Sequence, residues 1–253
     1  MSRPSQPVQI KEVEGAAKLS RPTVIVGVPE MGLVGTIAAS YLIDHLGLPE
    51  MASIESDMLP QMVVVEDSEP KEPIRIFAKG MLAVVLSEVP LSPRLSYEFV
   101  SEIVRWSKAK ECKMIVGITG LPSEDRVETG GDSVPLVLAV TNDKDLRKSI
   151  GDIGAHPFEH GILASTYATL LKRCTAMGVP NVTLLAESYA EFPDPGAAAA
   201  TLGVLSKLLP VAVDVKPLLE GAEEIRLRMR GLMNQTQQAI QAQGAQTMPG
   251  VYR

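Results

Sequence analysis

Short apolar runs alternate with amphipathic stretches along most of the chain. A short apolar run rich in β-branched side chains predicts a buried strand, whereas apolar residues spaced three and four apart predict a helix. Residues 23–28 (TVIVGV) form such a run, and a glycine loop and a helical pattern from about Leu33 to His45 follow it. The alternation continues, so we predict an α/β fold with a mostly parallel sheet and helices on both faces. Further predicted strands are 113–117, 136–141 and 181–186, and further predicted helices are 96–110 and 161–177.

The pattern changes between Ala52 and Leu86. Four strand-like runs (ASIES, QMVVVED, IRIFAKG and MLAVVLSE) follow one another there, separated by prolines and a glycine. No helical spacing interrupts them, so this segment predicts a meander of antiparallel strands. Lys79-Gly80 marks a tight hairpin within it.

The C-terminal third is predicted to be helical. An Ala-rich helix runs from Pro195 to about Leu209, and a last helix covers about 218–243. Its apolar stripe consists of Ile225, Met229, Leu232, Met233 and Ile240. Its second half (NQTQQAIQAQ) is almost entirely polar, so we expect it to project from the body. We therefore predict an α/β body at 1–217, this helix at 218–243, and a flexible tail at 244–253.

Composition narrows the class of protein. Hydrophobic residues make up 45% and charged residues 21% of the 253 residues, which is typical of a folded globular protein. The net charge of -6 and the 4% aromatic content argue against a nucleic-acid partner. No stretch resembles a signal peptide or an uninterrupted membrane span, so we expect a cytoplasmic protein. The two cysteines, Cys112 and Cys174, fit buried free thiols in a reducing compartment.

The glycine loop after the first predicted strand is a candidate phosphate site. Gly27, Gly32 and Gly35 lie at a strand-to-helix turn, where a helix N-terminus favours anions. Their spacing is not the dinucleotide fingerprint, and Leu33 follows the second glycine where a P-loop has lysine. Glu30 would repel phosphate. We therefore predict a structural glycine turn that allows close helix packing, without a nucleotide or other cofactor.

Two other patterns suggest catalysis. His156-Pro-Phe-Glu159-His160 matches the H-x-x-E-H string of zinc peptidases, but Pro157 disturbs the helix on which two histidines would share a face, so we predict no metal. Acidic residues also follow the predicted strands, at the sheet edge where α/β proteins bind ligands, and they leave a metal-assisted or acid/base enzyme as the alternative function. These carboxylates are Glu30, Glu88, Glu124, Asp125 and Glu187. The Gly-rich polar loop 121–132 is long enough to be functional, and its role stays open.

The extreme C-terminus carries a hydrophobic-Tyr-X sequence, Val251-Tyr252-Arg253. A polar helix and a small, Pro/Gly-containing spacer precede it. Such a spacer suits the presentation of a terminal carboxylate to a partner. We therefore take these three residues as a candidate docking motif.

Several of these segments together resemble one family. The stretch 25–35 (IVGVPEMGLVG) with 38–43 (AASYLI) looks like the opening motif of the proteasome assembly chaperone 2 family. The resemblance extends over roughly residues 20–230. Further matching segments, in chain order, are 117–120 (GITG), 161–163 (GIL), 185–187 (LAE) and 193–195 (PDP).

The resemblance implies a phosphorylase/hydrolase-like α/β fold, a body without established catalysis, and a homo-oligomer. It also implies that Val251, Tyr252 and Arg253 enter pockets between α-ring subunits of the proteasome core particle. We therefore expect a non-enzymatic, proteasome-binding protein. Assembly chaperone, gate-opening activator and adaptor all remain open, because each would use the same tail.

Overall fold

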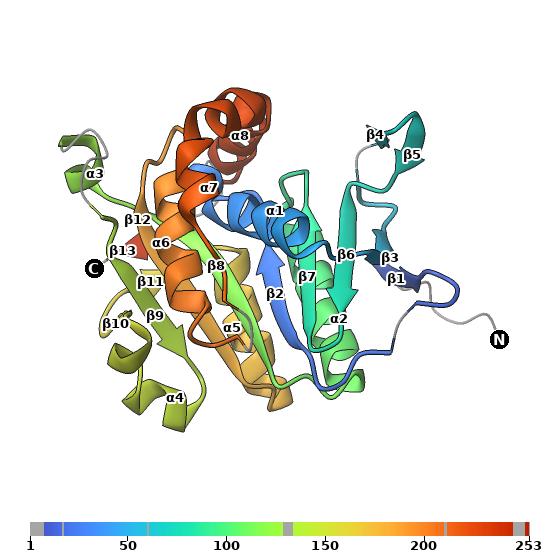
Figure 1. Cartoon of the computed structure of the whole chain (residues 1–253), viewed down its shortest axis with the longest axis horizontal. Coiled ribbons are helices and arrows are strands. Elements are labelled where there is room, and N and C mark those ends of the chain that lie inside the picture. The colour runs from blue at the N-terminus through green and yellow to red at the C-terminus, as the bar shows by residue number, and fades with distance from the viewer. Residues whose placement is uncertain are drawn as a thin grey trace.

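A computed structural model of the whole chain describes residues 8–16, 18–59, 61–128, 134–209, 212–244 and 251–252. Its centre is a nine-stranded sheet in the order β1-β3-β6-β7-β2-β8-β12-β9-β10 (Figure 1). In that order the strands are β1 (Gln9–Glu12), β3 (Glu50–Glu55), β6 (Ile74–Lys79), β7 (Leu82–Ser87), β2 (Thr23–Gly27), β8 (Met114–Pro122), β12 (Asn181–Ser188), β9 (Val137–Thr141) and β10 (His156–Pro157).

The middle of the sheet is parallel, and an antiparallel pair joins it to the flank on each side. Strands β7, β2, β8 and β12 run parallel to one another, whereas β6 pairs antiparallel with β7 and β9 pairs antiparallel with β12. The antiparallel flank at β6 follows from a two-residue turn, Gly80-Met81, between Lys79 and Leu82, in which Gly80 has φ +63°. The predicted α/β fold with a mostly parallel centre is confirmed, and the predicted hairpin lies at this turn.

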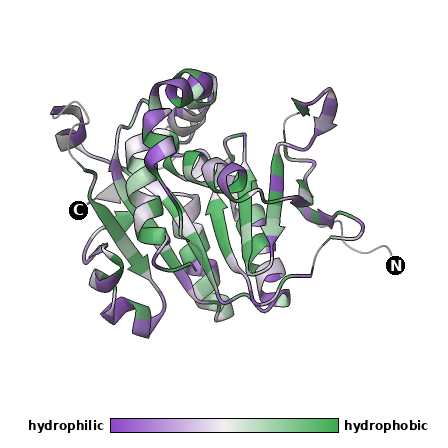
Figure 2. Ribbon diagram, in the orientation of Figure 1, coloured by the Kyte–Doolittle hydropathy of each residue, from purple (hydrophilic) through white to green (hydrophobic). Residues whose placement is uncertain are grey.

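Helices cover both faces of the sheet. On one face α1 (Val34–Leu46) packs against α6 (Pro195–Leu205), which also contacts α7 (Lys216–Glu220) and α8 (Ala222–Gly244). On the other face α2 (Pro93–Ala109) packs against α5 (Thr166–Met177). The parallel strands between these layers are mostly hydrophobic, whereas α8 is rich in hydrophilic residues (Figure 2). The short helix α4 (Lys144–Lys148) contacts β9, and the short helix α3 (Glu124–Glu128) follows the end of β8 (Figure 1).

Capping residues set the helix boundaries. The predicted helix 161–177 begins only at Thr166, because the Ser165 side chain accepts hydrogen bonds from the N–H groups of Tyr167 and Ala168. Residues 162–163 form the short strand β11 instead. The predicted last helix is divided at Gly221 into α7 and α8, and the Ala-rich helix ends at Leu205 rather than Leu209.

Helix α8 stays in contact with the body further along than its polar sequence indicated. Met233 is buried against the core, and Thr236, within the polar half, is also buried. The Thr236 hydroxyl donates to the carbonyl of Leu232, and Gln237 donates to the carbonyl of Glu191. The helix is therefore held by polar contacts as well as by its apolar stripe. Among the described residues, no helix is long and apolar enough to cross a membrane.

A small hairpin lies outside the main sheet. Strands β4 (Val64–Glu66) and β5 (Glu69–Lys71) pair antiparallel around a two-residue turn. Both turn residues, Asp67 and Ser68, have positive φ angles of 50° and 69°, as a type I′ turn requires. The β4 run was predicted as a strand, but β5 was not, because Pro70 interrupts it.

Candidate functional site

The glycine loop brings three elements into backbone contact. A Cβ placed on Gly27 would lie 2.3 Å from the carbonyl oxygen of Gly35, and one on Gly35 would lie 2.2 Å from that of Ile118. Gly32 has φ +62°, the left-handed region that favours glycine. These residues allow the start of α1 to lie directly on β2 and β8. Backbone atoms of the chain itself therefore occupy the space beside the glycines.

Glu30 fastens this loop to the start of α5. Its carboxylate accepts a hydrogen bond from the Thr166 N–H at 2.8 Å and another from the Thr119 hydroxyl at 3.1 Å. Burial, which disfavours the charged form, raises the pKa of Glu30 above its ordinary value of 4.5, although the hydrogen bonds oppose the shift. Glu30 thus has a structural role in closing the loop.

Tyr167 makes a second link between α5 and β2. Its hydroxyl accepts from the Val28 N–H at 3.0 Å and donates to the Val26 carbonyl at 3.3 Å. The side chain is fully buried, and burial raises the pKa of its phenol. Two hydrogen bonds to the Tyr167 hydroxyl therefore connect the end of β2 to α5.

The remaining strand-end carboxylates have different surroundings. Glu88 forms an ion pair with Arg75 at 2.7 Å, Glu124 is exposed on α3, and Glu187 lies within β12. No group of three or more His, Cys, Asp or Glu suited to holding a metal ion occurs in the parts of the chain that are described. The arrangement gives no support to the alternative of an enzyme built on these carboxylates.

The H-x-x-E-H string is not helical. His156 and Pro157 form strand β10, which pairs with β9, and Glu159 and His160 follow in an exposed loop. The zinc-peptidase site needs the two histidines one turn apart on one face of a helix. The backbone therefore does not produce the zinc-peptidase geometry.

A buried ion pair, which the sequence analysis did not anticipate, joins loop 121–132 to the start of α6. The Arg126 guanidinium donates to both carboxylate oxygens of Asp194, at 2.8 and 3.1 Å, and the two side chains are 3% and 0% exposed. Asp194 also accepts from the N–H groups of Ala197 and Tyr189, so it caps α6. Arg126 lies 5.3 Å from the centre of the Tyr189 ring. Part of this loop is therefore structural, and residues 129–133 of it lie outside the described residues.

Two residues of the candidate docking motif pair with the body of the protein. Val251 and Tyr252 form β13, which pairs antiparallel with β11 (Ile162–Leu163), with Tyr252 opposite Ile162 and Val251 opposite Leu163 (Figure 1). Leu163 packs against a small cluster containing Leu138 and Leu185, so β11 is itself anchored. Arg253 and the predicted flexible spacer 245–250 lie outside the described residues.

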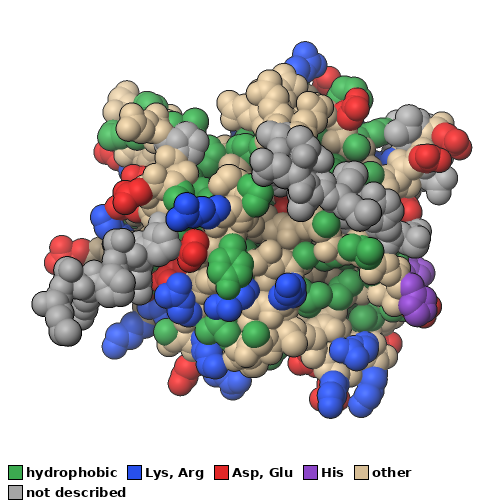
Figure 3. All heavy atoms as spheres, turned by 180° about the vertical axis from the view of Figure 1, so that it is seen from behind, with side chains coloured by type: hydrophobic (Ala, Val, Ile, Leu, Met, Phe, Trp, Pro, Cys, Tyr) green, Lys and Arg blue, Asp and Glu red, His purple; other side chains and the backbone are tan. Residues whose placement is uncertain are grey.

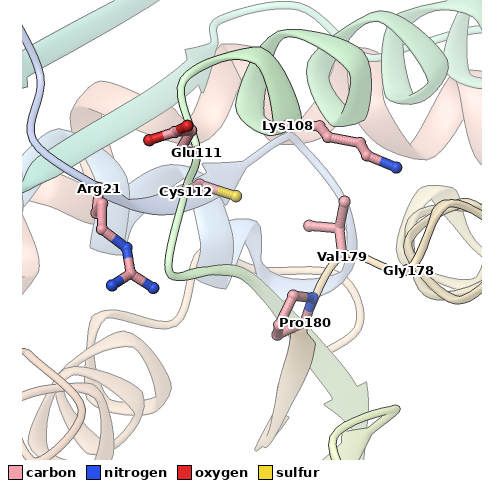
Figure 4. A pocket seen from close by; sticks show the side chains of 7 residues that line it. All are labelled: Arg21, Lys108, Glu111, Cys112, Gly178, Val179 and Pro180. Carbon is pink, nitrogen blue, oxygen red and sulfur yellow. The ribbon is translucent and has the colours of Figure 1, made fainter.

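A separate cavity opens at the opposite, amino-terminal edge of the parallel strands. It has a volume of about 510 Å³ and is lined by Arg21, Lys108, Glu111, Cys112 and residues 178–180 (Figure 4). Burial raises the pKa of the Cys112 thiol to about 11, which makes it a poor nucleophile near neutral pH. The cavity contains neither the glycine loop nor the tail.

Comparison with known proteins identifies the family. A family model described as the PAC2 family matches residues 24–233, which is more than half of the chain. The chain belongs to the PAC2 family. The resemblance found in the glycine loop is thereby confirmed, and the PAC2 match also covers the sheet apart from β1 and the helices of both layers as far as Met233 of α8.

Individual relatives match nearly the whole length of this chain. An uncharacterised protein of Methanocaldococcus jannaschii is 28% identical over 227 residues, which are 89% of this chain and 92% of that protein. Pyrococcus furiosus PbaA, described as an archaeal homolog of proteasome-assembly chaperone, superposes with a TM-score of 0.82 at 26% identity, covering 92% of this chain and 99% of PbaA. P. furiosus PbaB, described as an archaeal proteasome activator, has the same fold, with a TM-score of 0.75 at 21% identity over 90% and 99% of the two chains.

Proposed function

We propose that this PAC2 family protein is a non-enzymatic, cytoplasmic proteasome-binding protein, an assembly chaperone or a gate-opening activator. In this proposal its C-terminal tails enter pockets in the α-ring of the core particle. One observation carries the proposal: the chain ends in Val251-Tyr252-Arg253 on a body of the PAC2 family. The similarity to PbaA, a homolog of a proteasome-assembly chaperone, supports the same class of partner.

Each residue of the motif has a distinct chemical part in docking. The Arg253 carboxylate pairs with a pocket lysine, Val251 enters an apolar cleft, and Tyr252 supplies a rigid ring with one hydroxyl. A single three-residue contact is weak. A homo-oligomer presents several tails at once, which makes later binding steps intramolecular and raises the avidity by about 10² to 10⁴.

The pairing of β13 with β11 competes with this docking. The tail cannot enter a pocket on another protein while Val251 and Tyr252 are paired with residues 162–163. A ladder this short contributes about two hydrogen bonds of about 1 kcal/mol each, so release costs about 2 kcal/mol. The apparent affinity for the core particle is then lowered about 30-fold relative to a free tail.

A pull-down of core particle with purified full-length protein tests the proposal. Deletion of Val251–Arg253 should abolish retention without changing the fold or the mass of the oligomer. Tyr252→Ala should weaken binding by about 2 kcal/mol per tail, while the matched control Tyr252→Phe, which keeps the ring, should lose less. One extra residue after Arg253 moves the carboxylate by about 3.5 Å, so a C-terminal tag should abolish docking and an N-terminal tag should not. Equal retention of all these variants would place the function elsewhere on the body.

A further inference from the structure

The β4–β5 hairpin stands away from the body of the molecule (Figure 1), and exposed apolar side chains lie on and next to it. Val65 of β4 is 68% exposed, and Val63, which immediately precedes β4, is 57% exposed. Pro70 lies opposite Val65 in the ladder, and Met62, next to Val63, is 42% exposed. Several neighbouring apolar side chains in water mark an interaction site more often than a single exposed residue does.

A buried arginine holds this hairpin in place. Arg75 of β6, only 3% exposed, donates to both carboxylate oxygens of Glu66 at 2.7 and 2.6 Å and to Glu88 at 2.7 Å. An isolated two-stranded hairpin is marginally stable in water. The bidentate contact at the last residue of β4 supplies the support that the hairpin lacks by itself, and its apolar side chains are consequently presented in a defined orientation.

The outer face of α2 and α5 is complementary to this hairpin in charge. These two helices carry five Lys or Arg residues and two Glu residues, although the whole chain has a net charge of -6. Residues 62–72, which include the hairpin, carry four acids and one lysine. Figure 3 shows the face of the molecule that bears α2 and α5, where basic side chains gather around apolar ones. The basic residues on the two helices are Arg94, Arg105, Lys108, Lys172 and Arg173.

The same face also offers an apolar contact. Tyr97, at the outer surface of α2, is 51% exposed. The Arg173 guanidinium lies 5.6 Å from the centre of its ring, which holds the ring in place between the two helices. An ordered aromatic side chain with a basic rim is well suited to receive a small apolar hairpin with an acidic turn.

We propose that the β4–β5 hairpin of one subunit docks on the α2–α5 face of a second copy of this chain. The valines contact Tyr97, and Asp67 and Glu69 lie against the basic rim, while Glu66 keeps its contact with Arg75. Because the two surfaces differ, the interface is heterologous, and each subunit can use its hairpin on one neighbour and its α2–α5 face on another. This assembly does not require the core particle, so its test is independent of the proposed function.

Light scattering on the purified full-length chain at micromolar concentration tests the apolar part. The wild type should give a multiple of 27.1 kDa. The double substitution Val63→Ser, Val65→Ser should shift the mass toward one subunit, with at least a tenfold higher dissociation constant. Met81→Ser, which changes a residue 52% exposed outside the hairpin, should leave the mass unchanged. A 27 kDa wild type, or valine variants with the wild-type mass, would overturn the proposal.

Charge reversal tests the pairing of the two surfaces. Asp67→Lys with Glu69→Lys should dissociate the oligomer, and so should Arg94→Glu with Lys172→Glu, because each pair places like charges across the interface. All four substitutions in one chain restore opposite charges and should restore the oligomer. Circular dichroism establishes that each variant is folded. If the combined variant remains monomeric while each pair alone is folded, the two surfaces do not meet.

Discussion

Loss of Asp194 should destabilise the protein far more than loss of an ordinary helix cap. Asp194→Ala removes the cap of α6, which costs about 1 kcal/mol. It also breaks the buried ion pair between Asp194 and Arg126, which costs about 3 to 5 kcal/mol. The contact between Arg126 and the Tyr189 ring persists in this variant. We therefore expect the free energy of unfolding to fall by about 4 kcal/mol, the low end of the sum of these two costs. For a chain of this size, the melting temperature should fall by about 10 °C.

Thermal unfolding followed by circular dichroism measures this loss. The matched control is Asp143→Ala, because Asp143 caps α4 through the N–H groups of Asp145 and Leu146 without a buried ion pair. It should lose only about 1 kcal/mol. A double variant, Arg126→Met with Asp194→Ala, replaces both members of the buried ion pair by apolar side chains and should recover part of the stability. The reasoning is refuted if the Asp194→Ala and Asp143→Ala variants have the same melting temperature.

Two further predictions concern groups with raised pKa values. Glu30→Gln keeps an acceptor for the Thr166 N–H and removes a desolvated charge, so it should raise the melting temperature at pH 7. Because the pKa of Glu30 is higher in the folded than in the unfolded protein, the wild type becomes relatively more stable at low pH. The rise in melting temperature caused by Glu30→Gln should therefore shrink as the pH falls toward 4.5. A rise that does not depend on pH would contradict this cause. Burial raises the pKa of Cys112 to about 11 and that of Cys174 to about 12. At pH 8 iodoacetamide should therefore label Cys112 about 100-fold and Cys174 about 1,000-fold more slowly in the folded than in the unfolded protein. Mass spectrometry of the alkylated chain checks this, and rapid labelling of the native protein would contradict it.

The central strands and the two helical layers were predictable because their signals are local. The β-branched run at 23–28 and the amphipathic spacing of 96–110 each specify one element without reference to a partner. The strands β5, β11 and β13 were not predicted, because two or three residues become a strand only when another segment pairs with them. The Ser165 cap was visible in the sequence, but the preceding apolar residues 162–163 extended the apparent helix past it.

The buried contacts were harder to predict than the elements. Arg126 and Asp194 are 68 positions apart in the sequence. Arg126 lies in a run of polar residues that is typical of a solvent-exposed loop. Glu30 was expected to affect a ligand, whereas its partners are Thr119 and Thr166, which the fold brings from distant segments. The tail motif was recognisable from its sequence, but its pairing with β11 depends on tertiary structure.

The outermost strands of the large sheet have a consequence for colloidal behaviour. Among the described residues, β1 at one end carries the charged side chains of Lys11 and Glu12, and β10 at the other is only two residues long and contains Pro157, which has no N–H. Short, charged or proline-containing borders are poor templates for a strand from another molecule. Folded copies should therefore resist growth into cross-β fibrils through these borders, even in concentrated solution.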